Sequence, residues 1–260
     1  MDPNHKAQAR EPRPENNVPE SRDVAIVVMA RSPLTEGARI KTRLASSVPI
    51  DADRIALYEA FLFDILQSCR TMTDVVLRVA YTPEGGHHGF TALGVSDDEL
   101  IPQRGANLGE RERQLFEDLF LEGFKKVVII GSDSPTLPMS HVRDAITKLS
   151  ESRLRSVVLG PSNDGGYYLI ALSASPLGNA VPDLFTNIRW GAESALNDTV
   201  RASYSAGLQV ELLPKWYDVD DEQGISQLRT DLQDPQQAAL APQTTAMLQR
   251  IFQDKKQSST

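Results

Sequence analysis

Two segments place carboxylates directly after apolar runs, where they could bind a cation or a phosphate-bearing ligand. Asp133 follows the apolar run 126–130 in the sequence GSDSPTLP, and open α/β sheets bind ligands at the ends of their strands. In WYDVD, Asp218 and Asp220 alternate across one residue, so an extended backbone puts both on one side. Together the three could bind one Mg²⁺ or Mn²⁺ ion that also takes phosphate oxygens. The alternatives are a turn aspartate at 133 and an acidic first helical turn at 220–222.

A basic loop follows the first apolar run of the chain. Residues 30–44 include Arg31, Lys41 and Arg43 in a chain whose net charge is −8. Such a loop supplies the local positive field that a nucleotide phosphate needs, and Lys41 is the strongest candidate ligand. Ile40 stands where a Walker A loop requires glycine, so the loop is not of that type. A solvated loop with scattered cations is the alternative.

A third polar segment, SNDGGYYL, contains an aspartate followed by two glycines. Asp164 is a candidate catalytic residue that could deprotonate or hold an acceptor hydroxyl. Gly165 and Gly166 would let the backbone approach that acceptor closely. An Asp-Gly hairpin turn between two strands explains the same residues equally well.

Two further candidates stand near glycine turns. Gln103 and Gly105 precede a predicted helix and could contact the base, ribose or phosphates of a nucleotide donor. Trp190 could line the acceptor pocket, although tryptophan more often packs in a core or groove.

Composition favours an ordinary globular protein. The chain has 260 residues, of which 40% are hydrophobic and 24% charged, which is enough for one well-buried domain. The negative net charge argues against a general nucleic-acid surface. No apolar stretch is long enough to span a membrane and no secretory signal is recognisable, so we expect a cytoplasmic protein. The single cysteine, Cys69, falls on an apolar helical stripe and is interpreted as a small buried side chain.

Continuous apolar runs alternate with helix-period segments from residue 24 onward. This succession predicts an α/β fold with one Rossmann-like, mostly parallel sheet and helices on both faces. We expect Asp51 and Ser140 to cap helices and the strand from Tyr167 to add an antiparallel edge. The predicted strands are 24–30, 74–81, 126–130, 156–159, 167–172 and 209–213, and the predicted helices are 51–70, 108–122, 140–150 and 193–206.

The chain divides into three parts by composition. Residues 1–22 contain four prolines and a single large aliphatic side chain, which predicts a disordered N-terminal tail. Residues 23–232 form the predicted domain. Residues 233–260 are Gln- and Ala-rich at first and predict a C-terminal helix followed by a disordered end.

Five motifs occur in a fixed order: KTRLA, GSDSPTLP, NDGGYYLIAL, LFTNIRW and WYDVD. With these motifs, residues 24–232 resemble a bacterial glycosyltransferase family linked to arsenosugar biosynthesis and long catalogued as a domain of unknown function. They are more distantly similar to 2-phospholactate and molybdenum-cofactor guanylyltransferases. The resemblance implies a GT-A-like fold, a nucleoside-diphosphate donor and a divalent metal. The chain departs from the family pattern at 34–36, which resembles an insertion, and at Asn163, where an acidic residue is expected.

The resemblance also assigns residues to roles. It places Lys41 and Arg43 in the phosphate loop and Asp133 in the metal position. The guanylyltransferase relatives imply that Asp218 and Asp220 complete the metal shell, and that the segment 164–166 faces the acceptor.

We therefore expect a metal-dependent glycosyltransferase that uses a nucleotide-sugar donor and a small-molecule acceptor. A nucleotidyltransferase that releases pyrophosphate is the nearest alternative, and a non-catalytic nucleotide-binding protein is another. Sugar, base, acceptor, stereochemistry and oligomeric state stay open at this stage.

Overall fold

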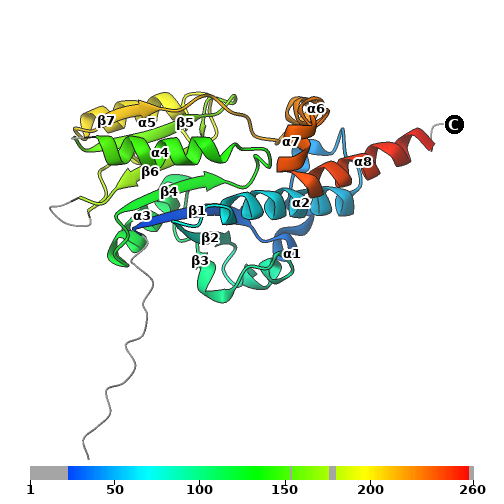
Figure 1. The fold of residues 1–260 in the computed structure, drawn as a ribbon, viewed down its shortest axis with the longest axis horizontal. Helices are drawn as coiled ribbons and strands as arrows, with labels where there is room; N and C mark the ends of the chain where they lie inside the picture. The colour runs from blue at the N-terminus through cyan, green and yellow to red at the C-terminus, as the bar shows by residue number, and fades with distance from the viewer. Residues whose placement is uncertain (1–22, 153, 176–179, 258–260) are drawn as a thin grey trace, which may run out of the picture.

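A seven-stranded sheet forms the centre of the molecule (Figure 1). The computed structural model describes residues 23–152, 154–175 and 180–257, so the predicted tail 1–22 lies outside the described residues. The strand order is β3-β2-β1-β4-β6-β5-β7. The strands are β1 (Val24–Arg31), β2 (Val76–Thr82), β3 (Leu100–Pro102), β4 (Lys126–Gly131), β5 (Ser156–Pro161), β6 (Tyr167–Ser173) and β7 (Gln209–Leu212).

Most strand pairs are parallel, which confirms the predicted fold class. β1 pairs in parallel with β2 and β4, and β5 with β7, whereas β6 is antiparallel to both β4 and β5. The prediction of an antiparallel strand from Tyr167 is correct, but its place at the sheet edge is wrong. β6 lies between β4 and β5, and residues 168–172 are all buried because helices cover both faces of the sheet there.

The four predicted helices 51–70, 108–122, 140–150 and 193–206 are present within two residues at each end, whereas the short helix at 33–36 was not predicted. The helices are α1 (Pro33–Glu36), α2 (Asp51–Arg70), α3 (Leu108–Leu121), α4 (Met139–Glu151), α5 (Ala195–Ser205), α6 (Glu222–Asp231), α7 (Pro235–Leu240) and α8 (Pro242–Gln257). The two predicted caps are wrong by one or two positions. Ile50 and Pro138 precede α2 and α4, and Asp51 instead pairs with Arg54 inside the first turn of α2.

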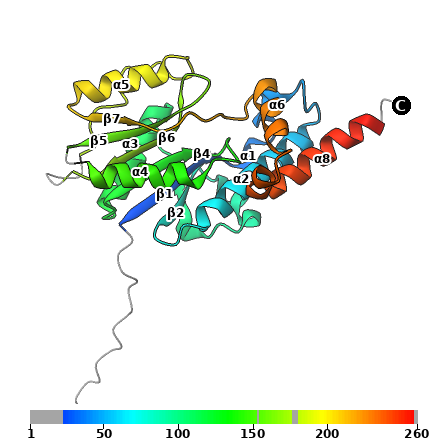
Figure 2. The same ribbon diagram turned by 45° about the horizontal axis from the view of Figure 1, so that its top comes forward.

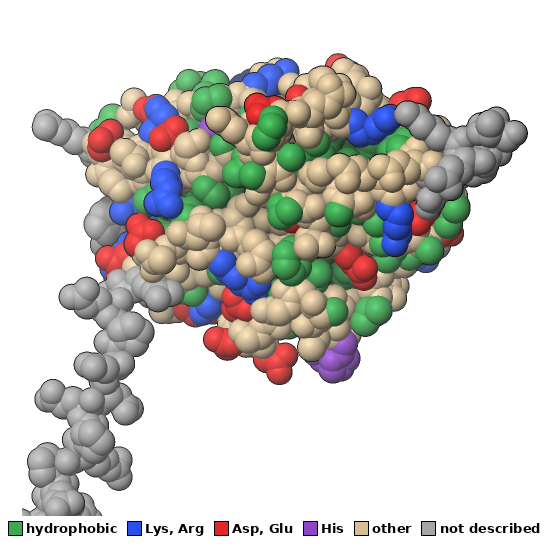
Figure 3. Space-filling model, turned by 45° about the vertical axis from the view of Figure 1, so that its right-hand side comes forward, with side chains coloured by type: hydrophobic (Ala, Val, Ile, Leu, Met, Phe, Trp, Pro, Cys, Tyr) green, Lys and Arg blue, Asp and Glu red, His purple; other side chains and the backbone are tan. Residues whose placement is uncertain are grey.

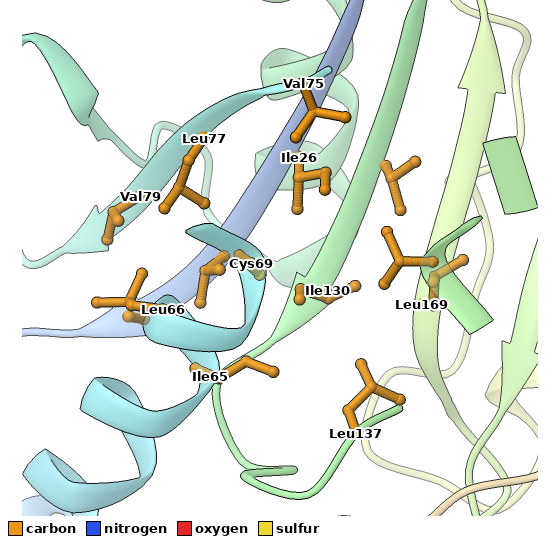
Figure 4. Close-up of a cluster of buried hydrophobic side chains, with 14 of the residues drawn as sticks. Ile26, Ile65, Leu66, Cys69, Val75, Leu77, Val79, Ile130, Leu137 and Leu169 are labelled. Carbon is orange, nitrogen blue, oxygen red and sulfur yellow. The ribbon is translucent and has the colours of Figure 1, made fainter. Parts of the chain in front are cut away.

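Helices cover both faces of the sheet (Figures 1 and 2). One face packs against α2 and α4, and the other against α3 and α5. In Figure 4, Ile65, Leu66 and Cys69 of α2 lie against Ile26 of β1 and Leu77 of β2. Cys69 is 1% exposed, as predicted. These two layers fix the carboxyl ends of β1 and β4 side by side, where the polar segments follow.

The C-terminal helix α8 packs along α2 (Figure 1). Phe61 of α2 shares a cluster of buried side chains with Met247 and Ile251 of α8. The Asp64 carboxylate accepts hydrogen bonds from the backbone N–H groups of Gln243 and Thr244, at 3.2 and 2.8 Å. Helix α8 is therefore packed against α2.

Two surface properties bear on partners. Among the described helices, none is both long enough and apolar enough to cross a lipid bilayer. On the face shown in Figure 3, acidic and basic side chains are interspersed.

Candidate active site

A cavity of about 810 Å³ opens where β1 and β4 end. Its walls come from these strand ends, the loop after β1, the start of α3, β6 and the segment before α6. Seven residues predicted from the sequence line it: Arg31, Lys41, Arg43, Gln103, Asp133, Asp218 and Asp220. The other five, Gly105, Asp164, Gly165, Gly166 and Trp190, are not among the lining residues.

Lys41 is the centre of the cavity's charged group. Its Nζ lies 2.5 Å from Asp133 Oδ1 and 2.6 Å from Asp220 Oδ1, and its side chain is only 4% exposed. The ammonium also lies 5.9 Å from the ring centroid of Tyr58 and 5.6 Å from that of Phe61, both on α2. The Lys41 backbone is left-handed, with φ 51°, a conformation that costs a non-glycine residue about 1 kcal/mol.

The pKa values in this group follow from burial and mutual charge. Burial alone would lower the pKa of the Lys41 ammonium, but Asp133 and Asp220 raise it above its ordinary value. Burial raises the pKa of Asp133 against the opposing effect of Lys41. Burial would also raise the pKa of Asp220, yet the Lys41 ammonium holds it below the usual range. Lys41 thus stays charged and neutralises part of a strongly acidic centre.

Asp218 joins three loops rather than touching Lys41. Its Oδ1 accepts a hydrogen bond from Ser134 at 2.8 Å, and its Oδ2 accepts one from Ser162 at 2.7 Å. The backbone N–H of Val219 donates to the Asp133 carbonyl oxygen at 2.9 Å. Burial raises the pKa of Asp218, and the two serine hydroxyls oppose this shift. These bonds hold the segment 216–220 against the end of β4. Asp218 and Asp220 both line the cavity there.

The next question is whether the described residues form a cluster of metal ligands. No group of three or more His, Cys, Asp or Glu side chains there is arranged to hold a metal ion. The Oδ1 atoms of Asp133 and Asp220 do converge, because both contact the same nitrogen.

Arginines surround the acidic centre. Arg31, Arg39, Arg43 and Arg111 line the cavity. Arg31 and Arg43 lower the pKa of Asp220 by their charge, after the larger effects of burial and Lys41. A ligand that enters therefore meets several cations outside a buried lysine–carboxylate group, an arrangement suited to a polyanion such as a diphosphate.

Gln103 is held in a fixed orientation in the cavity wall. Its Nε2 donates hydrogen bonds to the carbonyl oxygens of Ala80 at 2.7 Å and Ala30 at 3.3 Å. Since both amide hydrogens have backbone acceptors, the side-chain oxygen is left as an acceptor. Gly105 follows with φ 134° and packs against Glu110 of α3.

The segment after β5 is a turn. Asp164 is exposed, and its Oδ1 accepts a hydrogen bond from the backbone N–H of Gly166 at 2.9 Å. Gly165 has φ +85°, and a Cβ there would lie 2.1 Å from the carbonyl oxygen of Glu193. The turn is thus pressed against the chain that leads into α5.

Trp190 packs behind the cavity wall. A Cβ at Gly109 would lie 2.4 Å from its ring, and its ring meets Tyr167 edge-on with centroids 6.3 Å apart. Trp190 therefore contacts both α3 and β6.

Glu112 is the functional candidate that the sequence reasoning missed. It is 4% exposed, lines the cavity, and accepts a hydrogen bond from the Tyr167 hydroxyl at 2.6 Å. The signal was a carboxyl on the apolar stripe of α3, four residues after Leu108 and three before Leu115.

Comparisons with known proteins support the fold and the resemblance. A bacterial family described as "Uncharacterized protein conserved in bacteria (DUF2064)" matches residues 65–192. A comparison with curated proteins gives no match.

Solved structures provide the wider comparison. One is a protein from Desulfovibrio desulfuricans G20, provisionally described as a nucleotide-diphospho-sugar transferase. It is 29% identical, has a TM-score of 0.73, and the match covers 88% of this chain and 98% of the other.

Two more distant structures share the fold alone. A cytidylyltransferase from Leptospira borgpetersenii is 14% identical with a TM-score of 0.50, covering 81% of this chain and 87% of its own. The 4-diphosphocytidyl-2C-methyl-D-erythritol synthase of Anaerococcus prevotii is 10% identical and has a TM-score of 0.50. The match covers 81% of this chain and 98% of the synthase. The resemblance predicted from the motifs, to a bacterial family of unknown function and to a GT-A-like transferase fold, is therefore confirmed.

Proposed function

We propose that this protein is a metal-dependent glycosyltransferase that moves a glycosyl group from a nucleotide-sugar donor to a small-molecule acceptor. The observation that carries the proposal is the Lys41 ammonium between Asp133 and Asp220, inside an arginine-lined cavity at the strand ends. The similar structure from Desulfovibrio desulfuricans G20, with its nucleotide-diphospho-sugar description, supports the same class of donor.

Asp133 and Asp220 fit a hard divalent cation. Their oxygens converge on one point, and Mg²⁺ commonly binds through one or two carboxylates with the remaining ligands from substrate phosphates and water. A set of two carboxylates is therefore sufficient when a diphosphate is also present. The ion, when bound, would stabilise the negative charge that grows on the departing diphosphate.

Lys41 has a second role in this proposal. In the described arrangement it supplies the positive charge that the two carboxylates need. A divalent ion would take over that task and free the ammonium to contact the diphosphate, together with Arg31 and Arg43. Asp218, held by two serine hydroxyls, would position Asp220 by fixing the loop.

For the base and the acceptor, the proposal keeps the residues predicted from the sequence. Gln103 would present its fixed oxygen to a donor hydrogen of the base or ribose, with Gly105 completing the turn beside it. Contact of Asp164, Gly165, Gly166 or Trp190 with the acceptor stays a prediction.

The first experiment asks which donor is turned over. UDP-, GDP-, ADP- and TDP-glucose are each incubated with Mn²⁺ and with glycerol or water as the hydroxyl acceptor. Release of the free nucleoside diphosphate supports glycosyl transfer. Pyrophosphate released from a nucleoside triphosphate and glycerol phosphate, with no sugar donor, would instead support nucleotidyl transfer. Nucleotide-dependent thermal stabilisation without turnover in either assay would indicate a binding protein.

The Asp133→Asn variant tests the metal role. We expect it to lose the Mn²⁺-dependent turnover by about 10²-fold or more while the fold is kept, since a neutral amide cannot replace a charged ligand. Asp97→Asn, which alters an exposed carboxylate outside the cavity, is the matched control and should retain wild-type turnover. Turnover of Asp133→Asn close to that of Asp97→Asn would remove Asp133 from the metal site.

A further inference from the structure

Glu112 is a buried carboxyl in the cavity wall to which the proposed donor site assigns no task. The Tyr167 hydroxyl donates to its Oε2 at 2.6 Å. None of the ion pairs found among the described residues includes Glu112. A carboxyl that is 4% exposed and lacks a positive partner is a costly feature of any fold.

A purely structural role does not explain why a carboxyl occupies position 112 of α3. Leu115 and Leu119 continue the same helical face and are almost completely buried. An apolar side chain or a neutral amide would fill this position at lower cost in stability. Unpaired ionisable groups that face a cavity are instead typical of functional sites.

The surroundings of Glu112 set its proton affinity near the physiological range. Burial raises the pKa of Glu112 to about 8, and the hydrogen bond from Tyr167 opposes part of this rise. Burial, followed by the Glu112 charge, raises the pKa of Tyr167 well above its ordinary value, so the phenol stays protonated. From the sheet, β1 and β4 contribute the apolar side chains of Met29 and Ile129 to the same cavity. On α3 itself, Arg111 lines the cavity with its Nε bonded to the Gly105 carbonyl oxygen.

The two polar centres of the cavity belong to different faces of the sheet. Glu112 and Tyr167 lie on the side covered by α3. Lys41 lies beside the rings of Tyr58 and Phe61 of α2, which covers the other side. One cavity connects them. The same cavity therefore gives a sugar whose diphosphate binds at Lys41 a path toward Glu112.

We propose that Glu112 is a further catalytic residue, the base that removes the proton from the acceptor hydroxyl. The inference rests on the proposed glycosyl transfer and deepens it. The acceptor oxygen forms a bond to the anomeric carbon while the bond from that carbon to the diphosphate oxygen breaks. The bonding electrons leave with the diphosphate, and the hydroxyl proton passes to Glu112 and then to solvent. Attack from the side opposite the leaving group inverts the anomeric configuration. Tyr167 is a positioning residue that orients the carboxylate.

The test compares wild type with Glu112→Gln, using the nucleoside diphosphate-glucose that the donor assay selects, with glycerol and Mn²⁺. We expect Glu112→Gln to reduce kcat by about 10²–10⁴-fold and to leave the donor KM unchanged. In the wild type, kcat/KM should rise with pH and level above about pH 8, because only the deprotonated carboxylate accepts a proton. This rise should be absent in Glu112→Gln. Glu122→Gln, an exposed glutamate directly after α3, is the control and should match wild type.

Two measurements keep the proposal testable if Glu112→Gln folds poorly. Tyr167→Phe should retain most of kcat and move the inflection of the pH profile to higher pH, because the hydrogen bond that lowers the pKa is lost. The wild-type product should have inverted anomeric configuration by NMR.

Each other outcome overturns the proposal. A retained configuration, an unmoved inflection in Tyr167→Phe, or a kcat for Glu112→Gln within about threefold of wild type would exclude Glu112 as the base while leaving glycosyl transfer intact. Failure of wild type to release nucleoside diphosphate from any of the four sugar donors would overturn the proposed function and this inference together.

Discussion

At the scale of single residues, Lys41 determines the electrostatics of the site. One ammonium contacts Asp133 and Asp220 in a cavity that also receives the charges of Arg31 and Arg43. The side chains of Asp133 and Asp220 are 35% and 48% exposed, whereas that of Lys41 is 4% exposed. Under the proposed function, a divalent ion and the lysine would compete for the same two oxygens, and the charge of one would replace the charge of the other.

Replacement of Lys41 by methionine tests this competition. Without metal we expect the unfolding free energy to fall by about 1–3 kcal/mol, less than for a fully buried pair because both carboxylates touch solvent. Mn²⁺ should then raise the melting temperature of Lys41→Met more than that of wild type, since the carboxylates have lost their cation. Differential scanning calorimetry with and without Mn²⁺ measures both effects.

The matched control is Lys148→Met, which removes a lysine paired with Glu211 at 3.2 Å on the surface. Its melting temperature should change little, with or without the metal. Equal Mn²⁺ shifts for Lys41→Met and wild type would contradict the competition.

At the scale of elements, the turn between β5 and β6 is positioned by backbone contact. Gly165 has φ +85° and no room for a Cβ beside the carbonyl of Glu193. The backbone N–H of Leu196 at the start of α5 donates to the Gly165 carbonyl oxygen at 3.0 Å. The turn and the start of α5 are thus packed together and hydrogen-bonded through their backbones, and this contact determines where Asp164 lies.

The cost of crowding at this turn can be separated from the cost of backbone conformation. Gly165→Ala should lower the unfolding free energy by about 3 kcal/mol, because the new methyl group meets backbone atoms that cannot move aside. Gly191→Ala, with φ +77° and nothing within 4 Å of the added Cβ, should cost only about 1 kcal/mol. Urea denaturation of both variants gives the comparison, and equal losses would show that steric contact with Glu193 is unimportant.

At the scale of the whole molecule, the C-terminal helix is attached through a buried carboxylate. Asp64 is 1% exposed and satisfies two backbone N–H groups at the start of α8. A second contact between the same helices, Arg250 with Asp53 at 3.2 Å, lies at the surface. The boundary between a domain 23–232 and a C-terminal segment stays a prediction. The contacts between α2 and α8 join the two sides of this boundary, and their contribution to stability can be measured.

Substitution of the two aspartates distinguishes the buried attachment from the surface pair. Asp64→Ala should lower the unfolding free energy by about 1–3 kcal/mol, because it leaves buried backbone donors without acceptors. Asp53→Ala should change it by less than about 1 kcal/mol. Guanidinium denaturation monitored by tryptophan fluorescence measures both, and a larger loss for Asp53→Ala would contradict this account of the helix attachment.

The sequence by itself predicted most of the long elements and the class of fold, but not the short β3 and α1. Apolar runs such as 126–130 predict strands buried on both faces, and the stripe through Ile65 and Cys69 predicts one side of α2, because these patterns are local. It also predicted that Asp133 follows a strand end and that Asp218 and Asp220 share one loop. The five motifs placed the chain beside a known family for the same reason, since each is a short run of residues.

Only the tertiary structure decided which of these residues meet. It brought Lys41 to Asp220, 179 positions away, placed Asp164 in an exposed turn, and put Glu112 beside Tyr167 in the cavity wall. Such contacts depend on strand order and on how α3 packs against β6. Sequence spacing carries no record of either, because packing between distant segments is fixed by the shapes of all the buried side chains together.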